Sequence, residues 1–274
     1  MLQAADVWFG YDAAKPVLRG VTVAAAPSTV VGILGPNGSG KTTLLRLLAG
    51  TRAPQRGSVT FMATPLHQLS RGALATRMAV VPQETHLAFD YTVAEVAMMG
   101  RYAHLRPFEI EGPADVAAIE ETLASTGTLG LKDRPFTPLS GGEKQRVIIA
   151  AALAQIGATR SAAARNEQGF LLLDEPTASL DLAYQLEVAD LLRRLPHERG
   201  VGIVISTHDL GLAGTLCDRL AMIRDGQILA DGPTDDVLTP ENIRRVYGVE
   251  ADVLRHPSGH RVVVPIARLG RREP

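Results

Sequence analysis

The sequence lacks most features that mark a secreted or membrane-spanning chain. Its 274 residues include one cysteine, Cys217, so no intramolecular disulfide can form, which fits a reducing compartment. The longest unbroken apolar run covers residues 147–154, far short of the about 18 residues that a membrane-spanning helix needs. No basic start followed by an apolar run opens the sequence, so we expect no signal peptide.

An excess of charge of one sign is also missing. There are 28 Lys and Arg against 29 Asp and Glu, a formal net charge of −1, which gives no reason to expect nucleic acid or an acidic membrane as the main partner. Apolar residues make up 46% and charged residues 21%. This balance is typical of a globular protein with a sizeable core.

A glycine-rich segment joins an apolar run to a leucine-rich one. Residues 30–34 are a compact apolar run, and leucines recur at helical spacing over residues 44–48. The pattern predicts a strand, a loop and a helix, and the loop matches the phosphate-binding pattern in full. Its residues are Gly35, Pro36, Asn37, Gly38, Ser39, Gly40, Lys41 and Thr42.

The composition of this loop suits an anion. Glycines let successive backbone N–H groups point at one anion, and the helix that follows adds its positive N-terminal end. Lys41 can reach the β- and γ-phosphates, and the Thr42 hydroxyl can take one position around Mg²⁺. The alternative is a chance glycine turn, which the buried strand before the loop and the leucine-rich helix after it disfavour.

A second apolar segment ends in two carboxylates. Residues 170–173 are apolar on both strand faces and precede Asp174 and Glu175. We expect Asp174 to hold Mg²⁺, directly or through water, and Glu175 to polarise the attacking water. Because acidic residues are common at strand ends, this interpretation depends on the phosphate loop upstream.

Other segments predict the framework around these motifs. Apolar positions in residues 88–155 predict helices with one buried stripe, and so a mostly helical subdomain. Residues 186–195 predict a helix, and residues 201–205 predict another strand covered on both faces. The Arg-Asp-Gly sequence at 224–226 predicts a hairpin turn.

The segment Leu-Ser-Gly-Gly-Glu at residues 139–143 resembles the signature of ATP-binding-cassette (ABC) ATPases, and the other motifs follow the order of that family. The resemblance implies an α/β fold, a phosphate-loop cassette with a RecA-like parallel-sheet core, an antiparallel β edge and an inserted helical subdomain. The implied ATPase domain covers residues 1–250, with its helical subdomain at about 88–155 and a C-terminal extension at 251–274. Ser140 and Glu143 also match a capping box.

Single residues take roles from the same resemblance. Tyr11 resembles the aromatic residue that stacks on adenine, with a strand residue as the alternative. Gln83 resembles the glutamine that senses Mg²⁺ and faces the membrane partner, with a solvated loop residue as the alternative. Asp181 resembles the residue that crosses the dimer seam, with an ordinary helix cap as the alternative. His208 resembles the switch histidine that contacts the γ-phosphate, with a structural histidine as the alternative.

The resemblance thus implies one shared catalytic machinery with ATP and Mg²⁺ as cofactors. The implied catalytic residues are Glu175, His208, Lys41 and Gln83. The residues implied around the metal are Thr42, Gln83 and Asp174, and those implied around ATP are Tyr11, Gly35, Pro36, Asn37, Gly38, Ser39, Gly40, Lys41, Thr42, Thr43, Ser140, Gly141, Gly142 and Asp181.

Each motif occurs once, and the resemblance implies that the phosphate loop and the signature of one chain point in different directions. A homodimer in head-to-tail arrangement would then share two ATP sites, with Ser140, Gly141 and Gly142 presented to the γ-phosphate held by the other subunit. The γ-phosphate would bias this two-state association.

Segments 89–102, 179–185 and 238–249 are similar to importer ATPases for iron-siderophore, haem and cobalamin complexes. This similarity implies integral membrane permease subunits docked on the helical subdomain near Gln83, an indirect periplasmic or lipoprotein solute-binding protein, and no nucleic acid. It also implies a peripheral position on the cytoplasmic face of the inner membrane.

Several other functions compete with import. A split exporter has the same separate ATPase chain. A repair or chromosome ATPase carries a long coiled coil between loop and signature, and the short interval here shows no sustained heptads. A translation factor usually carries two cassettes. A regulatory module that binds ATP without hydrolysing it is disfavoured by Glu175 and His208.

Overall fold

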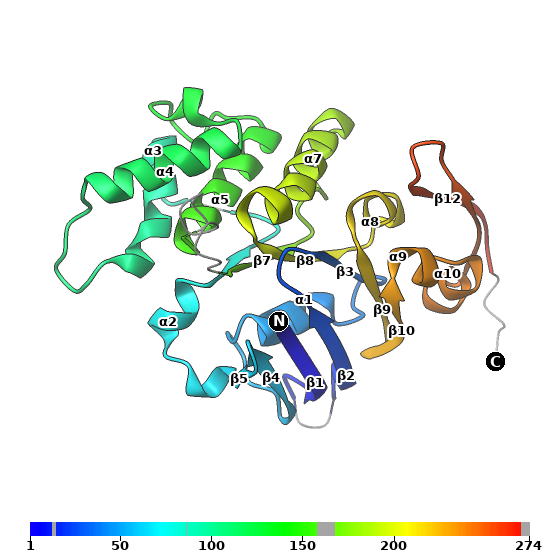
Figure 1. Cartoon of the computed structure of the whole chain (residues 1–274). Coiled ribbons are helices and arrows are strands. Elements are labelled where there is room, and N and C mark those ends of the chain that lie inside the picture. The colour runs from blue at the N-terminus through cyan, green and yellow to red at the C-terminus, as the bar shows by residue number, and fades with distance from the viewer. Residues whose placement is uncertain (13–14, 86, 158–167, 270–274) are drawn as a thin grey trace. The chain divides into compact units, whose positions relative to one another are not determined.

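The computed structural model describes residues 1–12, 15–85, 87–157 and 168–269 (Figure 1). They belong to two compact units, each of which is described by itself. The first unit comprises Met1–Ala25, Val30–Ala63 and Val204–Pro274, and the second comprises Ala26–Thr29 and Thr64–Ile203. None of the helices in the described ranges has the length and apolar character that crossing a bilayer requires.

An antiparallel sheet forms one layer of the first unit. Its strands follow the order β2-β1-β4, with Leu2 opposite both Ala25 and Phe61. Buried and less buried residues alternate along β1 and β2, the pattern of a sheet with one face on the core. The strands are β1 (Leu2–Phe9), β2 (Leu18–Ala25) and β4 (Arg56–Phe61).

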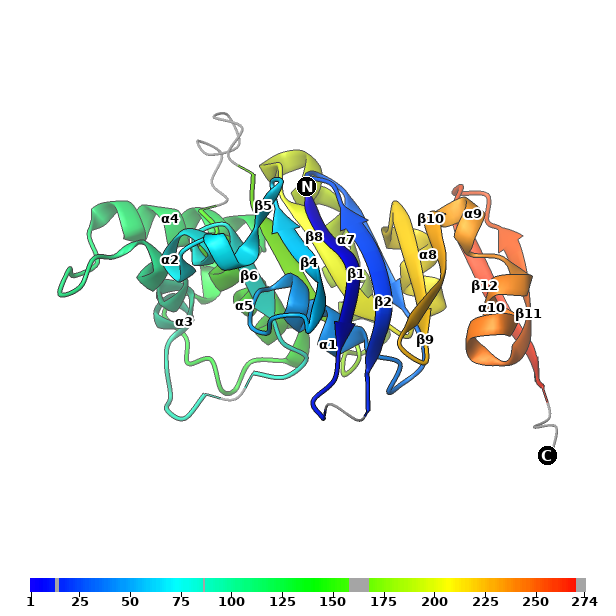
Figure 2. The same cartoon turned by 90° about the horizontal axis from the view of Figure 1, so that it is seen from below.

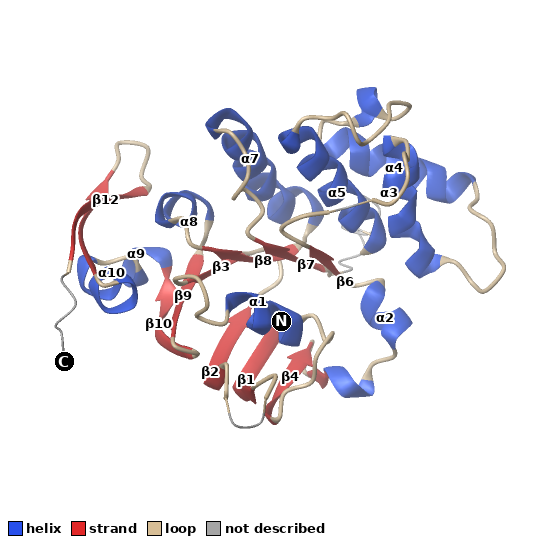
Figure 3. Ribbon diagram, turned by 180° about the vertical axis from the view of Figure 1, so that it is seen from behind, coloured by secondary structure: helices blue, strands red, loops and turns tan. Residues whose placement is uncertain are grey.

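A second group of strands in this unit surrounds β3 (Val30–Leu34), which is buried along its whole length. Here the order is β10-β9-β3-β8; β3 and β9 are parallel, with Leu34 opposite Met222. Helix α1 (Lys41–Leu48) lies between these strands and the antiparallel sheet (Figure 3) and buries its leucines on both sides. The other strands are β8 (Gly202–Thr207), β9 (Arg219–Arg224) and β10 (Gln227–Pro233).

The C-terminal part of the first unit ends in a two-stranded hairpin beside short helices (Figure 2). A Cβ on Gly214 would lie 2.7 Å from the carbonyl oxygen of Arg261, so glycine allows α8 to approach β12 closely. Along β12, Val262, Val264 and Ile266 stay exposed, and Pro265 interrupts the row of N–H donors. The elements are α8 (Leu210–Leu216), α9 (Thr234–Val237), α10 (Pro240–Tyr247), β11 (Val249–Arg255) and β12 (Arg261–Arg268).

The second unit contains two parallel strands, β6 and β7, with Val81 opposite Leu173. Residues 170–173 of β7 are fully buried, as expected for a strand covered on both faces. The elements outside the helical cluster are β5 (Thr64–Pro65), η1 (Leu66–Gln68), α2 (Arg71–Ala75), β6 (Met78–Val81), β7 (Phe170–Asp174) and α7 (Leu182–Arg199).

Three helices of the second unit gather into one cluster (Figure 1). Val96, Ile119, Phe136 and Val147 are among the residues of its buried core, and the helices bury one stripe each, as the apolar spacing predicted. The elements are α3 (Val93–Met99), η2 (Gly100–His104), α4 (Pro113–Ser125), η3 (Leu129–Leu131) and α5 (Gly141–Gln155).

A shielded ion pair ties this cluster together. Arg101 Nε lies 2.9 Å from Asp115 Oδ1, with side chains 13% and 12% exposed, and Arg101 Nη1 donates to the carbonyl of Ala154 at 2.9 Å. The Gly112 N–H, and then the Arg101 guanidinium, hold the pKa of Asp115 below its usual value. Removing one member of such a pair leaves an uncompensated charge, so the pair fixes the start of α4 against the end of α5.

The predicted α/β class, with parallel strands and an antiparallel β edge, is confirmed. The predicted hairpin is present: Asp225 and Gly226 have φ of 51° and 77° between β9 and β10. The helix predicted over residues 186–195 is longer and includes Pro196 near its end. The boundaries 1–250, 88–155 and 251–274 stay predictions.

Candidate active site

In the first unit the phosphate loop connects β3 to α1. Gly38 and Gly40 have φ of 79° and 107°, values that residues with a Cβ rarely adopt. A Cβ on Gly35 would lie 2.2 Å from the carbonyl oxygen of Ile223. The loop geometry therefore requires its glycines, and the start of α1 has no side-chain cap.

Two buried polar side chains in this loop suit an anion. Lys41 is 5% exposed, and its ammonium donates to the carbonyls of Gly35 at 2.9 Å and Pro36 at 3.3 Å. Ser39 Oγ is buried and has no hydrogen-bond partner in the described part of the chain. A buried polar atom without a partner is costly, and a phosphate oxygen would accept its hydrogen bond. The fit to a phosphate chain is therefore good.

Tyr11 lies next to this loop in the same unit. Its hydroxyl is 3.4 Å from Thr43 Oγ1 and accepts a 3.0 Å hydrogen bond from Arg46, both on α1, and the bond with Thr43 is the main cause that lowers the pKa of Tyr11. The ring meets Phe9 edge-on and is 56% exposed. Tyr11 follows the end of β1, so it is not the strand residue that the alternative predicted.

His208 belongs to the same unit and directly follows β8, as predicted. The next residue caps α8: Asp209 Oδ1 accepts from the N–H groups of Gly211 at 2.8 Å and Leu212 at 3.0 Å. The Asp209 N–H in turn donates to Thr207 Oγ1 at 3.0 Å. These bonds fix the backbone on both sides of His208, whose side chain is exposed.

In the second unit, Gln83 and the two carboxylates lie at the carboxyl ends of the parallel strands β6 and β7. Val81, the last residue of β6, lies opposite Leu173 of β7. Gln83 follows the end of β6 by two positions, Asp174 is the last residue of β7, and Glu175 follows it. Glu175 has φ 47°, a left-handed conformation that costs a non-glycine residue roughly 1–3 kcal/mol and clusters at functional sites.

The signature residues begin α5 in this unit. Ser140 Oγ accepts from the Glu143 N–H at 3.3 Å, and Glu143 Oε2 accepts from the Ser140 N–H at 2.8 Å, so the predicted capping box is confirmed. The Ser140 N–H, and then the Ser140 hydroxyl, lower the pKa of the Glu143 carboxyl. Asp181 stands at the N-cap position of α7, as the helix-cap alternative has it, although its side chain makes no capping hydrogen bond. Its role at the dimer seam stays a prediction.

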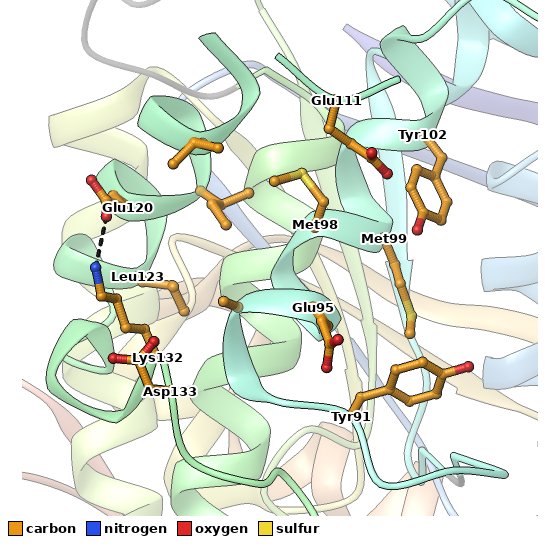
Figure 4. Close-up of a pocket in the computed structure, with 13 residues that line it drawn as sticks. Tyr91, Glu95, Met98, Met99, Tyr102, Glu111, Glu120, Leu123, Lys132 and Asp133 are labelled. Atoms are coloured by element: carbon orange, nitrogen blue, oxygen red, sulfur yellow. Dashed lines mark hydrogen bonds and ion pairs between the residues drawn. The ribbon is translucent and has the colours of Figure 1, made fainter. Parts of the chain in front are cut away.

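A pocket of about 450 Å³ opens in the helical cluster of the second unit (Figure 4). Two tyrosines and two methionines form much of its apolar lining. The lining also includes four carboxylates and a single lysine, Lys132, whose Nζ lies 2.9 Å from Glu120 Oε1. The lining residues are Tyr91, Ala94, Glu95, Met98, Met99, Tyr102, Glu111, Val116, Ile119, Glu120, Leu123, Lys132 and Asp133.

A strand, a glycine loop with a buried lysine and a helix define a phosphate-loop nucleotide-binding protein. The chain belongs to the ABC transporter family, whose model matches residues 18–178. It is an ATPase of that type and binds ATP, as its motifs predicted.

Relatives match the chain over most of its length. It is 44% identical over 244 residues to the hemin import ATP-binding protein HmuV of Bordetella bronchiseptica, covering 89% of this chain and 90% of that protein. It is 37% identical over 248 residues to the cobalamin import ATP-binding protein BtuD of Halobacterium salinarum, covering 90% and 59%. A solved chain of a metal-chelate type ABC transporter in an inward-facing conformation superposes with a TM-score of 0.81 at 26% identity, covering 97% and 96%.

Proposed function

We propose that the chain is the ATP-hydrolysing subunit of an ABC importer for a metal-chelate substrate, with haem or cobalamin complexes and iron-siderophores as the candidate class. The observation that carries the ATPase part is the phosphate loop, where Lys41 and Ser39 are buried in a glycine-shaped cradle. The names of the relatives, HmuV and BtuD, support the import part.

In this proposal, Lys41 and the loop backbone bind the triphosphate and Tyr11 stacks on adenine. Glu175 takes up the proton of the attacking water, and His208 contacts the γ-phosphate and orients that water. Mg²⁺, when bound by Thr42, Asp174 and Gln83, would neutralise charge on the phosphates. Water attacks phosphorus directly, the bond to the leaving diphosphate breaks, and no covalent enzyme intermediate forms.

Purified protein is expected to release inorganic phosphate from Mg-ATP. Because the proposed site depends on Mg²⁺, chelating the metal should lower the steady-state rate to background, and returning Mg²⁺ should restore it. Phosphate release with and without chelator, at equal ATP, measures this. Binding of ATP with no phosphate release under any Mg²⁺ concentration would instead support a regulatory module.

The proposal includes a homodimer in which Ser140, Gly141 and Gly142 of one subunit face the nucleotide of the other. It also includes permease subunits in the inner membrane, with the chain peripheral on the cytoplasmic side, and a solute-binding protein that acts indirectly. Genes for a permease and a solute-binding protein beside this one would support import, whereas an exporter gene or repair genes would favour those alternatives.

We assign the acidic pocket of the second unit, defined by its lining residues above, as the place where the permease docks. Its lining offers apolar contacts from Tyr91, Met98 and Met99. Four carboxylates against one ammonium give it a negative rim, and the ammonium is already paired with Glu120. Charge complementarity therefore selects a cytoplasmic segment with apolar residues and Lys or Arg beside them.

Replacing Glu111 and Asp133 by lysine is expected to weaken co-purification of the permease from detergent extracts by roughly 10-fold or more, because like charges would face each other. Phosphate release by the isolated chain should stay unchanged. The matched control is Asp190→Lys, on an exposed carboxylate of α7. Equal recovery of the permease with the double variant and the control would contradict this docking site.

A further inference from the structure

The first turns of α5 and α7 are in direct contact within the second unit (Figure 1). A Cβ atom on Gly142 would lie 2.4 Å from Cδ1 and 2.6 Å from Cγ of Tyr184, closer than real Cβ atoms come to other atoms. The Tyr184 side chain therefore lies against the backbone of Gly142, and any larger residue at position 142 must displace one of the two helices or the ring. Beside it, a Cβ on Gly141 would lie 3.1 Å from Leu180.

The segment that carries Tyr184 is itself held in place. Gln185 Nε2 donates to the carbonyl of Leu180 at 2.9 Å and to that of Thr177 at 3.4 Å, and the Gln185 N–H donates to the carbonyl of Asp181. The Gln185 side chain therefore ties the start of α7 to the carbonyls of the segment before it. The backbone around Asp181 is thus fixed to the same helix turn that supplies Tyr184.

A second link between the helices lies one turn further along. Arg146 of α5 forms an ion pair with Glu187 of α7. The Arg146 side chain is 18% exposed and that of Glu187 is 49% exposed, so the pair lies at the surface and salt weakens it. Two contacts at successive turns, an aromatic ring on a glycine and an ion pair, fix both the spacing and the rotation of the two helix starts.

Resting on the function proposed above, we propose that Tyr184 is a positioning residue for the signature. Its ring holds Ser140, Gly141 and Gly142 at a fixed height relative to Asp181, so that one subunit presents both segments to its partner together. The capping hydrogen bonds of Ser140 within the described residues go to Glu143 of its own helix. Without the ring, the first turn of α5 has a gap where the contact was.

The test uses a Glu175→Gln background and measures the ATP concentration needed for half-maximal dimerisation, by light scattering after size exclusion. Tyr184→Ala is expected to raise it by roughly 10- to 100-fold, because displacing an acting group by about 1 Å can have effects of that size. Tyr184→Phe keeps the ring and should match the parent. Leu186→Ala, an exposed residue of α7, is the matched control and should also match the parent.

Binding of ATP to the monomer distinguishes a positioning role of Tyr184 from a general loss of folded structure in the variant. Tyr184→Ala should bind ATP as the parent does, since the phosphate loop belongs to the first unit. A lower melting temperature with unchanged ATP dependence of dimerisation would overturn the proposal, because it would leave only a packing role. Failure of Tyr184→Phe to restore dimerisation would overturn it too. A parent that never dimerises counts against the proposed function instead.

A double-mutant cycle on steady-state turnover, made in the protein that keeps Glu175, tests the proposal independently. Gly142→Ala alone forces a Cβ into Tyr184 and should lower kcat strongly. In Tyr184→Ala the space is open, so adding Gly142→Ala should lower kcat by at least about 5-fold less than it does when Tyr184 is present, as for residues in direct contact. Additive losses would overturn the proposal.

Discussion

Replacing Glu175 by glutamine is expected to lower the turnover of ATP by about 100- to 10,000-fold, the range that a positioned general base contributes. Glutamine has nearly the same shape, and the left-handed backbone at position 175 (φ 47°) strains it no more than it strains glutamate. It cannot accept the proton of the attacking water. Phosphate release in single and multiple turnover measures the loss.

The same variant should keep its affinity for ATP and accumulate as a dimer, because the bound ATP is no longer hydrolysed. Light scattering in ATP should show the dimer and in ADP the monomer. Asp190→Asn, an exposed carboxylate of α7, is the control and should behave as the parent. A Glu175→Gln protein that stays monomeric in ATP, or that hydrolyses at the parental rate, would show that Glu175 has been assigned wrongly.

Replacing Lys41 by alanine is expected to weaken ATP binding by about 10- to 100-fold, since hydrogen bonds to charged groups contribute about 1.5–3 kcal/mol. Turnover should fall further, by about 100- to 1,000-fold, as when one preorganised donor to a developing charge is removed. Lys41 is buried and held by two carbonyls of the loop, so its ammonium is already aimed. Titration with ATP and phosphate release measure the two effects separately.

Arg193→Ala is the control for Lys41, because Arg193 is a partly exposed cation of α7 that pairs only with its neighbour Asp190 among the described ion pairs. Its loss should change neither quantity. If Lys41→Ala binds and hydrolyses ATP as the parent does, the phosphate loop is not the nucleotide site and the proposed function is wrong.

The elements around the phosphate loop could be predicted because each has a strong local cause. The apolar run of β3 and the leucines of α1 lie at the predicted positions. The glycines between them predict the loop. The turn between β9 and β10 was equally readable, since Asp225 and Gly226 tolerate positive φ. The spacing of Ser140 and Glu143 predicts their capping box in the same way.

Other features could not be predicted because no local pattern encodes them. The acidic pocket takes its lining from segments that are separate in the chain. The contact of Tyr184 with Gly142 depends on how α7 packs on α5. The sequence does not predict the C-terminal hairpin, because Pro265 interrupts the strand pattern. The roles of Tyr11, Gln83, Asp181 and His208 stay predictions until the variants are measured.

Pro265 also has a consequence for how this chain behaves in concentrated solution. A two-stranded hairpin with exposed Val262, Val264 and Ile266 is apolar and extended. Exposed strands of this kind can pair with strands of other chains and so cause aggregation. A residue without an N–H in the middle of β12 breaks the continuous ladder that an incoming strand would need. The hairpin can therefore keep an exposed apolar face while resisting the addition of further strands along its edge.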